Sequence, residues 1–290
     1  GNINTFDQKQ IEYSFQDRLK KTDDLVHKAG KRRLESSDLE VGSVLSGGID
    51  SGLVTAIASE YNKNVKTFTV SFDGAYDEAP LAKLVAQKYQ TQHTEIKISF
   101  ENLQADLEKI LGNYGEPFFD SSAIPSYYVS KEAKKYVTVI LNGDGADELF
   151  GGYRRYVPFA RYDFFKKNFL VKKGASFIKQ TLPASNNKKS TYNYLYRLAS
   201  LASNSDLEIY LSAGVDIFED YQQYIISPGF DYLNNIKDDF DKIANSNLSA
   251  LKKIMNLDFD TNLCSDLLVK MDIETMANSQ AGKSAILSKN

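Results

Sequence analysis

Short apolar runs alternate with segments of helical periodicity through the first half of the chain. Strands are predicted for the runs 41–45, 65–72, 94–98 and 136–141, which are rich in β-branched side chains. Helices are predicted between them, over 52–61, 77–89, 103–111 and 122–136. Two helices carry an apolar stripe on one face, made by Leu81, Leu84, Val85 and Tyr89 in one and by Leu103, Leu107, Ile110 and Leu111 in the other. This alternation predicts βαβ crossovers, and so an α/β fold with a parallel sheet and helices on both of its faces.

The second half of the chain has few strand signals. Beyond about Tyr156 the clearest patterns are helical, over 192–201 and 248–271, and Pro183 and Pro228 mark breaks. We therefore predict residues 1–157 as the α/β core with an N-terminal helical lead-in, and residues 158–290 as a mostly helical part of the same domain. The helical part is rich in tyrosine, which indicates either an interface, such as that of a homodimer, or a buried core.

The bulk composition is that of an ordinary globular protein, with 290 residues of which 42% are hydrophobic and 25% charged. A net charge of −3 argues against a general nucleic-acid binder and against a membrane-surface binder. No apolar run approaches the roughly 20 residues that span a bilayer, and the N-terminal residues lack the apolar core of a signal peptide. The single cysteine, Cys264, excludes an internal disulfide and fits a reducing, cytoplasmic setting. We expect it to be a small buried residue.

The predicted strand at 41–45 runs into the turn Leu45-Ser46-Gly47-Gly48-Ile49-Asp50-Ser51. Two consecutive glycines let backbone N–H groups converge on an anion, and the following helix offers a positive N-terminus. Ser46 and Ser51 can donate hydroxyl hydrogen bonds. Asp50 is an acceptor in this turn, which makes sense if Mg²⁺ lies between its carboxylate and a phosphate. The pattern predicts a phosphate-binding loop, and the alternative is a glycine turn in which Ser and Asp only cap the helix.

A second glycine-rich turn, Asn142-Gly143-Asp144-Gly145-Ala146-Asp147, follows the predicted strand 136–141. Because ligands of parallel sheets bind beyond the carboxyl ends of the strands, we expect both turns at the same edge of the sheet. Asp144 and Asp147 are three residues apart and can face one site if the turn continues as a helix. The alternative is an acidic turn that caps the helix beginning near Glu148.

These turns resemble the signatures of one enzyme family. The first is similar to the SGGxDS pyrophosphate loop of the ATP pyrophosphatases, and no Walker A pattern is present. The second, continued to Tyr153, resembles the asparagine synthetase signature S-G-D/E-G-x-D-E-x-F-x-G-Y, with Asn142 in place of the usual serine. Weaker matches are the segments 67–72 (TFTVSF), 116–122 (EPFFDSS) and 270–277 (KMDIETMA). The resemblance is to the synthetase domain of the asparagine synthetase family, and it is strongest over residues 40–157.

The resemblance implies an adenine nucleotide α-hydrolase-like fold and an ATP-dependent ligase. Such an enzyme adenylates a carboxylate, here aspartate as the first candidate, and forms an amide with ammonia while AMP and pyrophosphate are released. The residues implied to bind ATP are Leu45, Ser46, Gly47, Gly48, Asp50, Ser51, Val70 and Gly143. The resemblance further implies that Asp50 and Asp147 hold Mg²⁺, that Asp144 lies beside the reacting centre, and that Lys283 balances the charge of the phosphates.

The sequence departs from the family pattern in two places. Complete members begin with a glutaminase domain whose N-terminal cysteine is the nucleophile, whereas this chain has Gly1 and no cysteine before Cys264. We therefore expect ammonia to come from solution or from a glutaminase domain or subunit outside this sequence. Gln280 also runs straight into Ala281-Gly282-Lys283 where the family continues with E-x-R-S-P-F-L-D, as if a segment were deleted or skipped.

Two alternative functions would use the same turns. One is a relative that amidates or cyclises a different substrate, such as a sugar acid, a peptide or a β-amino acid, because its phosphate chemistry would be the same. The other is a nucleotide-binding subunit without catalysis. The absent glutaminase domain favours that alternative, and the intact Asp50, Asp144 and Asp147 argue against it.

Overall fold

The computed structural model of the chain describes residues 13–72, 77–118, 120–160 and 246–287 and, outside these ranges, residues 173–175, 177, 191, 192, 196, 199 and 243. The chain divides into two compact units, Gly1–Gly145 together with Leu267–Asn290, and Ala146–Asp266. This division differs from the predicted boundary between residues 157 and 158. The chain leaves the first unit directly after the second glycine-rich turn and returns to it after Asp266.

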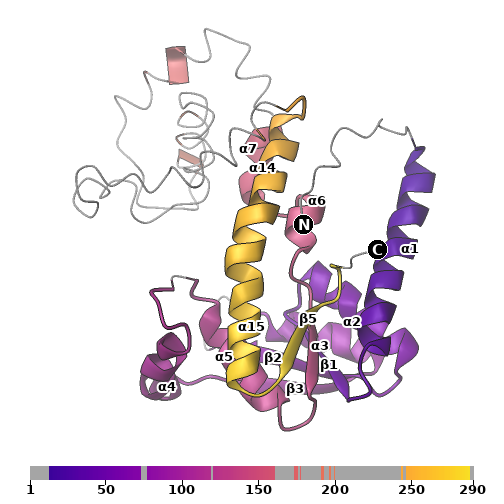
Figure 1. Ribbon diagram of the computed structural model, residues 1–290, viewed down its shortest axis with the longest axis vertical. Coiled ribbons are helices and arrows are strands. Elements are labelled where there is room, and N and C mark those ends of the chain that lie inside the picture. Colours follow the sequence, from indigo (N-terminus) through magenta and orange to yellow (C-terminus); the bar gives the residue numbers. More distant parts are fainter. Residues whose placement is uncertain are drawn as a thin grey trace. The chain divides into compact units, whose positions relative to one another are not determined.

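The first unit is built on a parallel sheet with the strand order β3-β2-β1-β4-β5 (Figure 1). Its strands are β1 (Val41–Val44), β2 (Lys66–Ser71), β3 (Gln92–Lys97), β4 (Val139–Asn142) and β5 (Ala281–Ser284). Neighbouring strands are parallel throughout, and Gly42 of β1 lies opposite Lys66 on one side and Ile140 on the other. The four strands predicted from the sequence are confirmed, although β4 begins later than expected. β5 escaped prediction because its sequence, AGKS, has no β-branched or aromatic residue.

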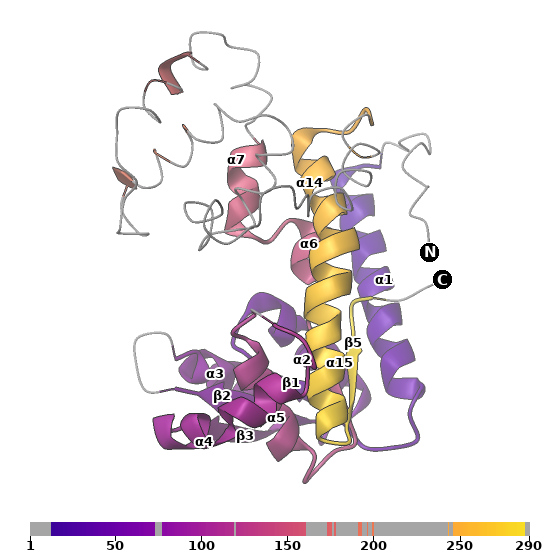
Figure 2. The same cartoon turned by 60° about the vertical axis from the view of Figure 1, so that its left-hand side comes forward.

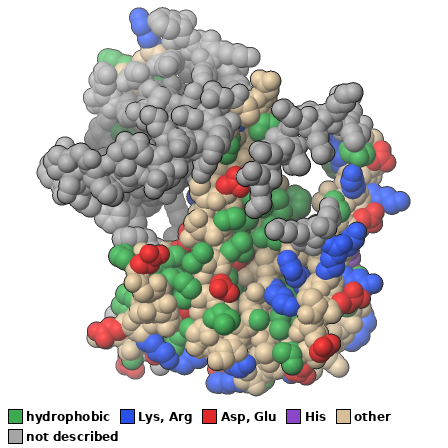
Figure 3. Space-filling view, viewed as in Figure 1, with side chains coloured by type: hydrophobic (Ala, Val, Ile, Leu, Met, Phe, Trp, Pro, Cys, Tyr) green, Lys and Arg blue, Asp and Glu red, His purple; other side chains and the backbone are tan. Residues whose placement is uncertain are grey.

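Helices cover both faces of this sheet, as predicted (Figure 2). They are α1 (Phe15–Glu35), α2 (Ile49–Tyr61), α3 (Ala79–Tyr89), α4 (Phe100–Gly112), α5 (Ala123–Ala133) and α15 (Leu268–Ala277). Successive residues of β1 face opposite sides: the Ser43 and Thr55 hydroxyls are 3.2 Å apart on the α2 side, whereas Gly42 lies against Phe68 on the α5 side. On the face shown in Figure 3, Lys and Arg side chains gather along α1, whose last turn contains Arg32 and Arg33. Cations suit the negative end of a helix.

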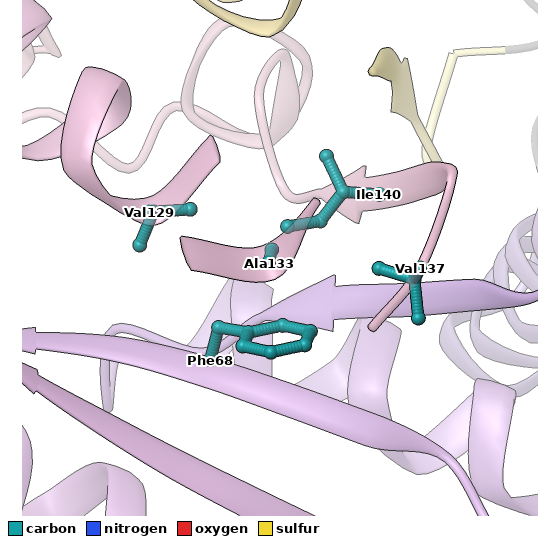
Figure 4. Packing of buried hydrophobic residues seen from close by; sticks show 5 residues of the cluster. All are labelled: Phe68, Val129, Ala133, Val137 and Ile140. Atoms are coloured by element: carbon teal, nitrogen blue, oxygen red, sulfur yellow. The ribbon is translucent and has the colours of Figure 1, made fainter. Parts of the chain in front are cut away.

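The core between the sheet and α5 is made by Phe68, Val129, Ala133, Val137 and Ile140 (Figure 4). Each of these residues is at most 4% exposed. Full burial of one large apolar side chain stabilises the fold by about 1.5–3 kcal/mol. In β1, a Cβ on Gly42 would lie 2.9 Å from the Phe68 ring and 3.0 Å from Val137. Glycine therefore lets β1 lie against this cluster, beside β4 with which it pairs.

The apolar stripe predicted for α3 is buried only in part, because Val85 packs against the core while the two leucines do not. Leu81 is 55% exposed and Leu84 62% exposed, whereas Ala82 and Ala86 pack in the core against Leu45. α3 runs very close to the first glycine-rich turn, where a Cβ on Gly47 would lie 3.0 Å from the Ala82 N atom. Small residues are required at this contact, so the leucines face outward. Of the predicted α4 stripe, Ile110 is fully buried, whereas Leu107 and Leu111 are exposed.

The chain returns to the first unit through a helical run of changing geometry. α14 (Ala250–Asp258) continues into the π-helix η3 (Phe259–Leu267) and then into α15. The helix predicted over 248–271 is thus confirmed in position, and the sequence did not predict its π-helical centre. Cys264 lies in η3 and is exposed, so the expectation of a buried cysteine was wrong.

A tight turn joins α15 to β5. Ser279 has a left-handed φ of 55°, and the Gln280 N–H donates to Thr275 O at 2.9 Å. The buried side chain of Gln280 donates to Val137 O at 3.1 Å. β5 then pairs with β4 and lies alongside α15 (Figure 2). The junction that looked discontinuous in the sequence is therefore a compact connection between two packed elements.

The second unit is helical in its described residues. It contains α6 (Ala146–Phe150), the 3₁₀-helix η1 (Arg154–Tyr156), α7 (Val157–Ala160), α14 and nearly all of η3. Asp258 accepts hydrogen bonds from Arg155 Nη2 at 2.8 Å and from the Tyr156 hydroxyl at 2.6 Å, which ties η1 to α14. The helix predicted over 192–201 lies mostly outside the described residues. None of the helices in the described residues combines the length and the hydropathy that a membrane-spanning segment needs.

Candidate active site

The strand order brings the carboxyl ends of β1 and β4 together. From β1 the chain crosses through α2 to β2 on one side, whereas β4 lies on the other side of β1. Open α/β sheets bind ligands beyond the carboxyl ends of their strands at such a reversal of strand order. Both glycine-rich turns meet there: a Cβ on Gly143 would lie 3.1 Å from Asp50 Cβ and 3.2 Å from Ser51 N. The prediction that the two turns share one edge is confirmed.

Leu45 anchors the first turn to the sheet. Its side chain is fully buried, its N–H donates to Phe68 O at 2.9 Å, and its carbonyl accepts a hydrogen bond from the Thr69 hydroxyl. Gly47 follows with a φ of 82°, in the left-handed region that favours glycine. A Cβ at this position would also lie 2.9 Å from Glu78 O. The first glycine of the turn is therefore required by the backbone, whatever ligand the turn holds.

Two hydroxyl groups cross the inside of this turn. Ser51 Oγ accepts from the Ser46 N–H at 3.1 Å and donates to Gly48 O at 3.3 Å. Ser46 Oγ lies 3.0 Å from Ser51 Oγ and accepts from the Gly48 N–H at 3.3 Å. Ser51 is buried, and Ser46 is exposed. Ser51 thus shapes the turn from the inside, while the Ser46 hydroxyl lies on the exposed side of the turn, where a ligand could replace its contact with Ser51.

Asp50 lies in the first turn of α2, close to an uncapped helix end. The N-cap of α2 is Gly48, which has no side chain to accept hydrogen bonds from the first N–H groups. These groups and the helix dipole favour an anion. Burial raises the pKa of the Asp50 carboxyl. A cation beside Asp50 would therefore stabilise its charged form, and an anion at the helix end would be bound at the same time.

Asp144 is fixed through its backbone in the second turn. Its N–H donates to Asn142 Oδ1 at 3.3 Å, and its carbonyl accepts from Ser284 Oγ at 2.7 Å. Ser284 ends β5, so the strand that the sequence did not predict supports this turn directly. The half-buried Asp144 is in the turn that contacts Asp50, and its place beside a reacting centre stays a prediction.

Three other predicted site residues have different surroundings. Val70 lies near the carboxyl end of β2 and packs against Ile98 and its buried neighbours. Lys283 lies in β5 and donates to Ser36 Oγ at 3.0 Å, so contact with phosphates would require its side chain to leave Ser36. Asp147 lies in α6 of the second unit, whereas Asp50 lies in the first. The roles assigned to these residues stay predictions.

The donor groups suit magnesium that is bound together with phosphate. Among the described residues, no group of three or more histidine, cysteine, aspartate or glutamate side chains could hold a metal ion. Mg²⁺ commonly uses only one or two carboxylates, with substrate phosphates and water as its other ligands. Asp50, whose pKa is raised by burial, is a carboxylate that a cation would stabilise. Asp50 would supply one such carboxylate, and Asp147, which lies in the second unit, stays a predicted second donor.

A buried ion pair near this edge of the sheet was not predicted from the sequence. Lys270 is 5% exposed, and its ammonium donates to Asp120 Oδ2 at 2.8 Å and to Ser122 Oγ at 2.5 Å. Burial works to raise the pKa of Asp120, but Lys270 and Ser122 outweigh it and hold that pKa below its ordinary value. The pair joins α15 to the start of α5. Lys270 and Asp120 are 150 positions apart, so no local pattern could reveal their contact.

Comparison with known proteins gives a match over nearly the whole chain. The family model described as Asparagine synthase matches residues 21–289. The glutamine-hydrolysing asparagine synthetase 1 of Bacillus subtilis strain 168 is 34% identical over 248 residues, which are 84% of this chain and 38% of that protein. A relative from Methanocaldococcus jannaschii is 33% identical over 259 residues, which are 87% of this chain and 48% of the relative. The chain thus spans less than half the length of either relative.

Two solved structures show a weaker likeness, each at 13% sequence identity. An NH3-dependent NAD synthetase from Campylobacter jejuni has a TM-score of 0.35, with 80% of this chain and 96% of that chain covered. The NMN synthetase from Francisella tularensis has a TM-score of 0.37, with 91% and 94% covered. The family match runs from within α1 through both glycine-rich turns to beyond the end of β5. On that match, this chain belongs to the asparagine synthase family.

Proposed function

We propose that this chain is the synthetase part of an asparagine synthetase, an ATP-dependent ligase that forms an amide. Aspartate supplies the carboxylate, ATP activates it, and ammonia is the nitrogen source. AMP and pyrophosphate are the other products. Family membership supports the reaction class, and the name of the Bacillus relative supports aspartate as the substrate.

One contact carries the proposal. Gly143 lies against Asp50 and Ser51 where the strand order reverses, so the phosphate loop and the turn of Asp144 adjoin. A nucleotide bound with its phosphates on the loop would have its α-phosphorus near the carboxylate of a substrate bound at the second turn. Activation of a carboxylate by ATP needs this proximity of the two reacting groups.

In the first step, a carboxylate oxygen of aspartate attacks the α-phosphorus of ATP. The bond from that phosphorus to the bridging oxygen breaks, and pyrophosphate leaves. The N–H groups at the start of α2 and the Ser46 hydroxyl would hold the leaving pyrophosphate, while Ser51 keeps the turn in shape. Mg²⁺ bound by Asp50 and Asp147 would neutralise part of the phosphate charge.

In the second step, ammonia attacks the carbonyl carbon of the acyl-adenylate. The bond to the AMP oxygen breaks, AMP leaves, and one proton is released from the nitrogen to give the neutral amide. Asp144 would orient the reacting groups by hydrogen bonding. Water must be kept away at this stage, because hydrolysis of the adenylate would return aspartate without an amide.

The test is aspartate-dependent formation of AMP, pyrophosphate and asparagine from Mg-ATP and ammonium chloride by the full chain. Asp50→Ala is expected to lower aspartate-dependent exchange of labelled pyrophosphate into ATP by about 100-fold or more, because a charge that stabilises the transition state is removed. Its unfolding temperature should stay near that of the wild type. Asp24→Asn, on the exposed surface of α1, is the control and should keep full exchange.

Each outcome separates one part of the proposal from the others. Full exchange in Asp50→Ala would contradict the metal role of Asp50. AMP formed with another carboxylate, and not with aspartate, would retain the ligase chemistry and replace the substrate. ATP binding without any AMP would favour a nucleotide-binding subunit. Glutamine in place of ammonium tests whether the chain needs a separate source of ammonia.

A further inference from the structure

The turn that follows α6 closes tightly around Asp147. The Gly151 N–H donates to Asp147 O at 2.8 Å, and the Gly152 N–H donates to the same oxygen at 3.1 Å. The Tyr153 hydroxyl donates to Glu148 Oε1 at 2.6 Å. Burial, together with the hydrogen bond to Glu148, raises the pKa of Tyr153, so this hydroxyl remains a donor. All these contacts lie within the second unit, and they hold the backbone of the turn on both sides of Asp147.

The Asp147 carboxylate fills the space that a side chain of Gly152 would need. A Cβ on Gly152 would overlap Asp147 Oδ1 and would lie 3.1 Å from Asp147 Cγ and 3.4 Å from its Cα. These are the three nearest atoms, so the obstacle is this one residue. Gly152 is not among the glycines with a positive φ, and its backbone would accept alanine. Glycine is therefore needed at this position for the carboxylate and not for the backbone.

We propose that Gly152 is a positioning residue for the metal carboxylate of Asp147. Its missing side chain leaves room for the conformation in which Asp147 binds Mg²⁺. The overlap of an alanine would fall on the far end of a flexible side chain, which can rotate to another staggered conformation while the turn stays closed. This inference rests on the proposed function, in which Asp147 shares Mg²⁺ with Asp50.

The test uses Mn²⁺ in place of Mg²⁺. Binding of Mn²⁺ to the full chain is measured from the electron paramagnetic resonance signal of the ion that stays unbound. For Gly152→Ala, we expect the dissociation constant for Mn²⁺ to rise about tenfold or more, as it should for Asp147→Ala, with an unfolding temperature near that of the wild type. Gly174→Ala is the matched control in the same unit, because a Cβ there meets no atom within 4 Å, and it should keep wild-type binding. Because Gly152 acts through Asp147, the double variant that carries both Gly152→Ala and Asp147→Ala should bind Mn²⁺ no more weakly than Asp147→Ala alone.

Wild-type Mn²⁺ binding by Gly152→Ala, together with its loss in Asp147→Ala, would overturn the inference. If Asp147→Ala keeps Mn²⁺, the metal role in the proposed function fails, and a crystal structure of Gly152→Ala then decides the inference separately. A changed Asp147 side-chain conformation supports the positioning contact, and an unchanged one overturns it. If Gly152→Ala does not fold, folding restored by adding Asp147→Ala supports the contact, and a double variant that stays unfolded overturns it.

Discussion

At the scale of single residues, α15 buries two ionisable side chains one helical turn apart. Lys270 is paired with Asp120, whereas Glu274 is fully buried near the polar groups of Tyr114 and Asn113. Burial raises the pKa of Glu274, and the nearby polar groups of Tyr114 and Asn113 offset this only in part. A buried carboxylate without a cation destabilises the folded state whenever it is ionised.

Replacing Glu274 by glutamine is expected to stabilise the protein at about pH 8 by roughly 1–3 kcal/mol, because the amide has no charge to desolvate. A raised pKa means that the stability contributed by Glu274 is complete below its unfolded value of 4.5 and is lost as the pH rises through the folded value. Urea unfolding should therefore show a difference between the variant and the wild type that grows from about pH 4 to pH 8. Glu108→Gln, on the exposed face of α4, is the control. Equal stabilities at pH 8 would contradict this account.

At the scale of elements, the close approach of α3 to the phosphate loop decides which side of the helix is buried. Ala82 and Ala86 pack against Leu45, and the loop lies so close to α3 that no side chain would fit at Gly47. Of the apolar stripe seen in the sequence, Val85 packs against this core, whereas Leu81 and Leu84 lie on the outer surface. A tight helix-to-loop contact thus outweighs the hydrophobic pattern, because large side chains would not fit inside it.

Two substitutions in α3 test this orientation. Ala82→Leu is expected to destabilise the protein by roughly 1–3 kcal/mol, because extra carbon atoms are forced into a packed contact beside the loop. Leu84→Ala should change the free energy of unfolding by about 0.5 kcal/mol or less, because Leu84 is 62% exposed. Chemical denaturation of both variants measures the two effects. A larger loss for Leu84→Ala than for Ala82→Leu would mean that the leucine face is the buried one.

At the scale of the whole molecule, the first unit is closed by segments from distant parts of the sequence. Arg33 at the end of α1 donates to Ser284 O at 3.2 Å and to Leu287 O at 2.5 Å. Ser284 in turn donates to the carbonyl of Asp144. α1 therefore supports β5 and, through it, the second glycine-rich turn.

Removing this support is expected to weaken the unit. Arg33→Met should destabilise it by roughly 2 kcal/mol, because two carbonyl groups lose a charged hydrogen-bond donor while the aliphatic packing is kept. Thermal unfolding measures the loss. Lys28→Met, on an exposed position of the same helix, is the control and should leave the unfolding temperature unchanged. Equal unfolding temperatures for the two variants would contradict a supporting role of Arg33.

The local elements of this protein could be predicted from its sequence. Strand, glycine turn and helix follow one another within a few residues, so β1, the phosphate loop and α2 could be recognised together, and likewise β4 and the second turn. The phosphate and metal binding expected of these turns could also be predicted, because hydroxyls, glycines and carboxylates at such spacings are typical of sites that bind phosphate and its metal. The strand β5, with the sequence AGKS, could not be predicted, because only its pairing with β4 makes it a strand.

Tertiary structure alone decided which of these pieces meet. The contact of Gly143 with Asp50, the ion pair of Lys270 with Asp120 and the outward face of α3 all depend on residues that are far apart in the chain. Short-range pattern reflects the preferences of neighbouring residues, whereas these contacts are set by the strand order and by the space left between packed elements. The sequence therefore predicted the components of the site, and the packing of the sheet and its helices decided how those components are arranged.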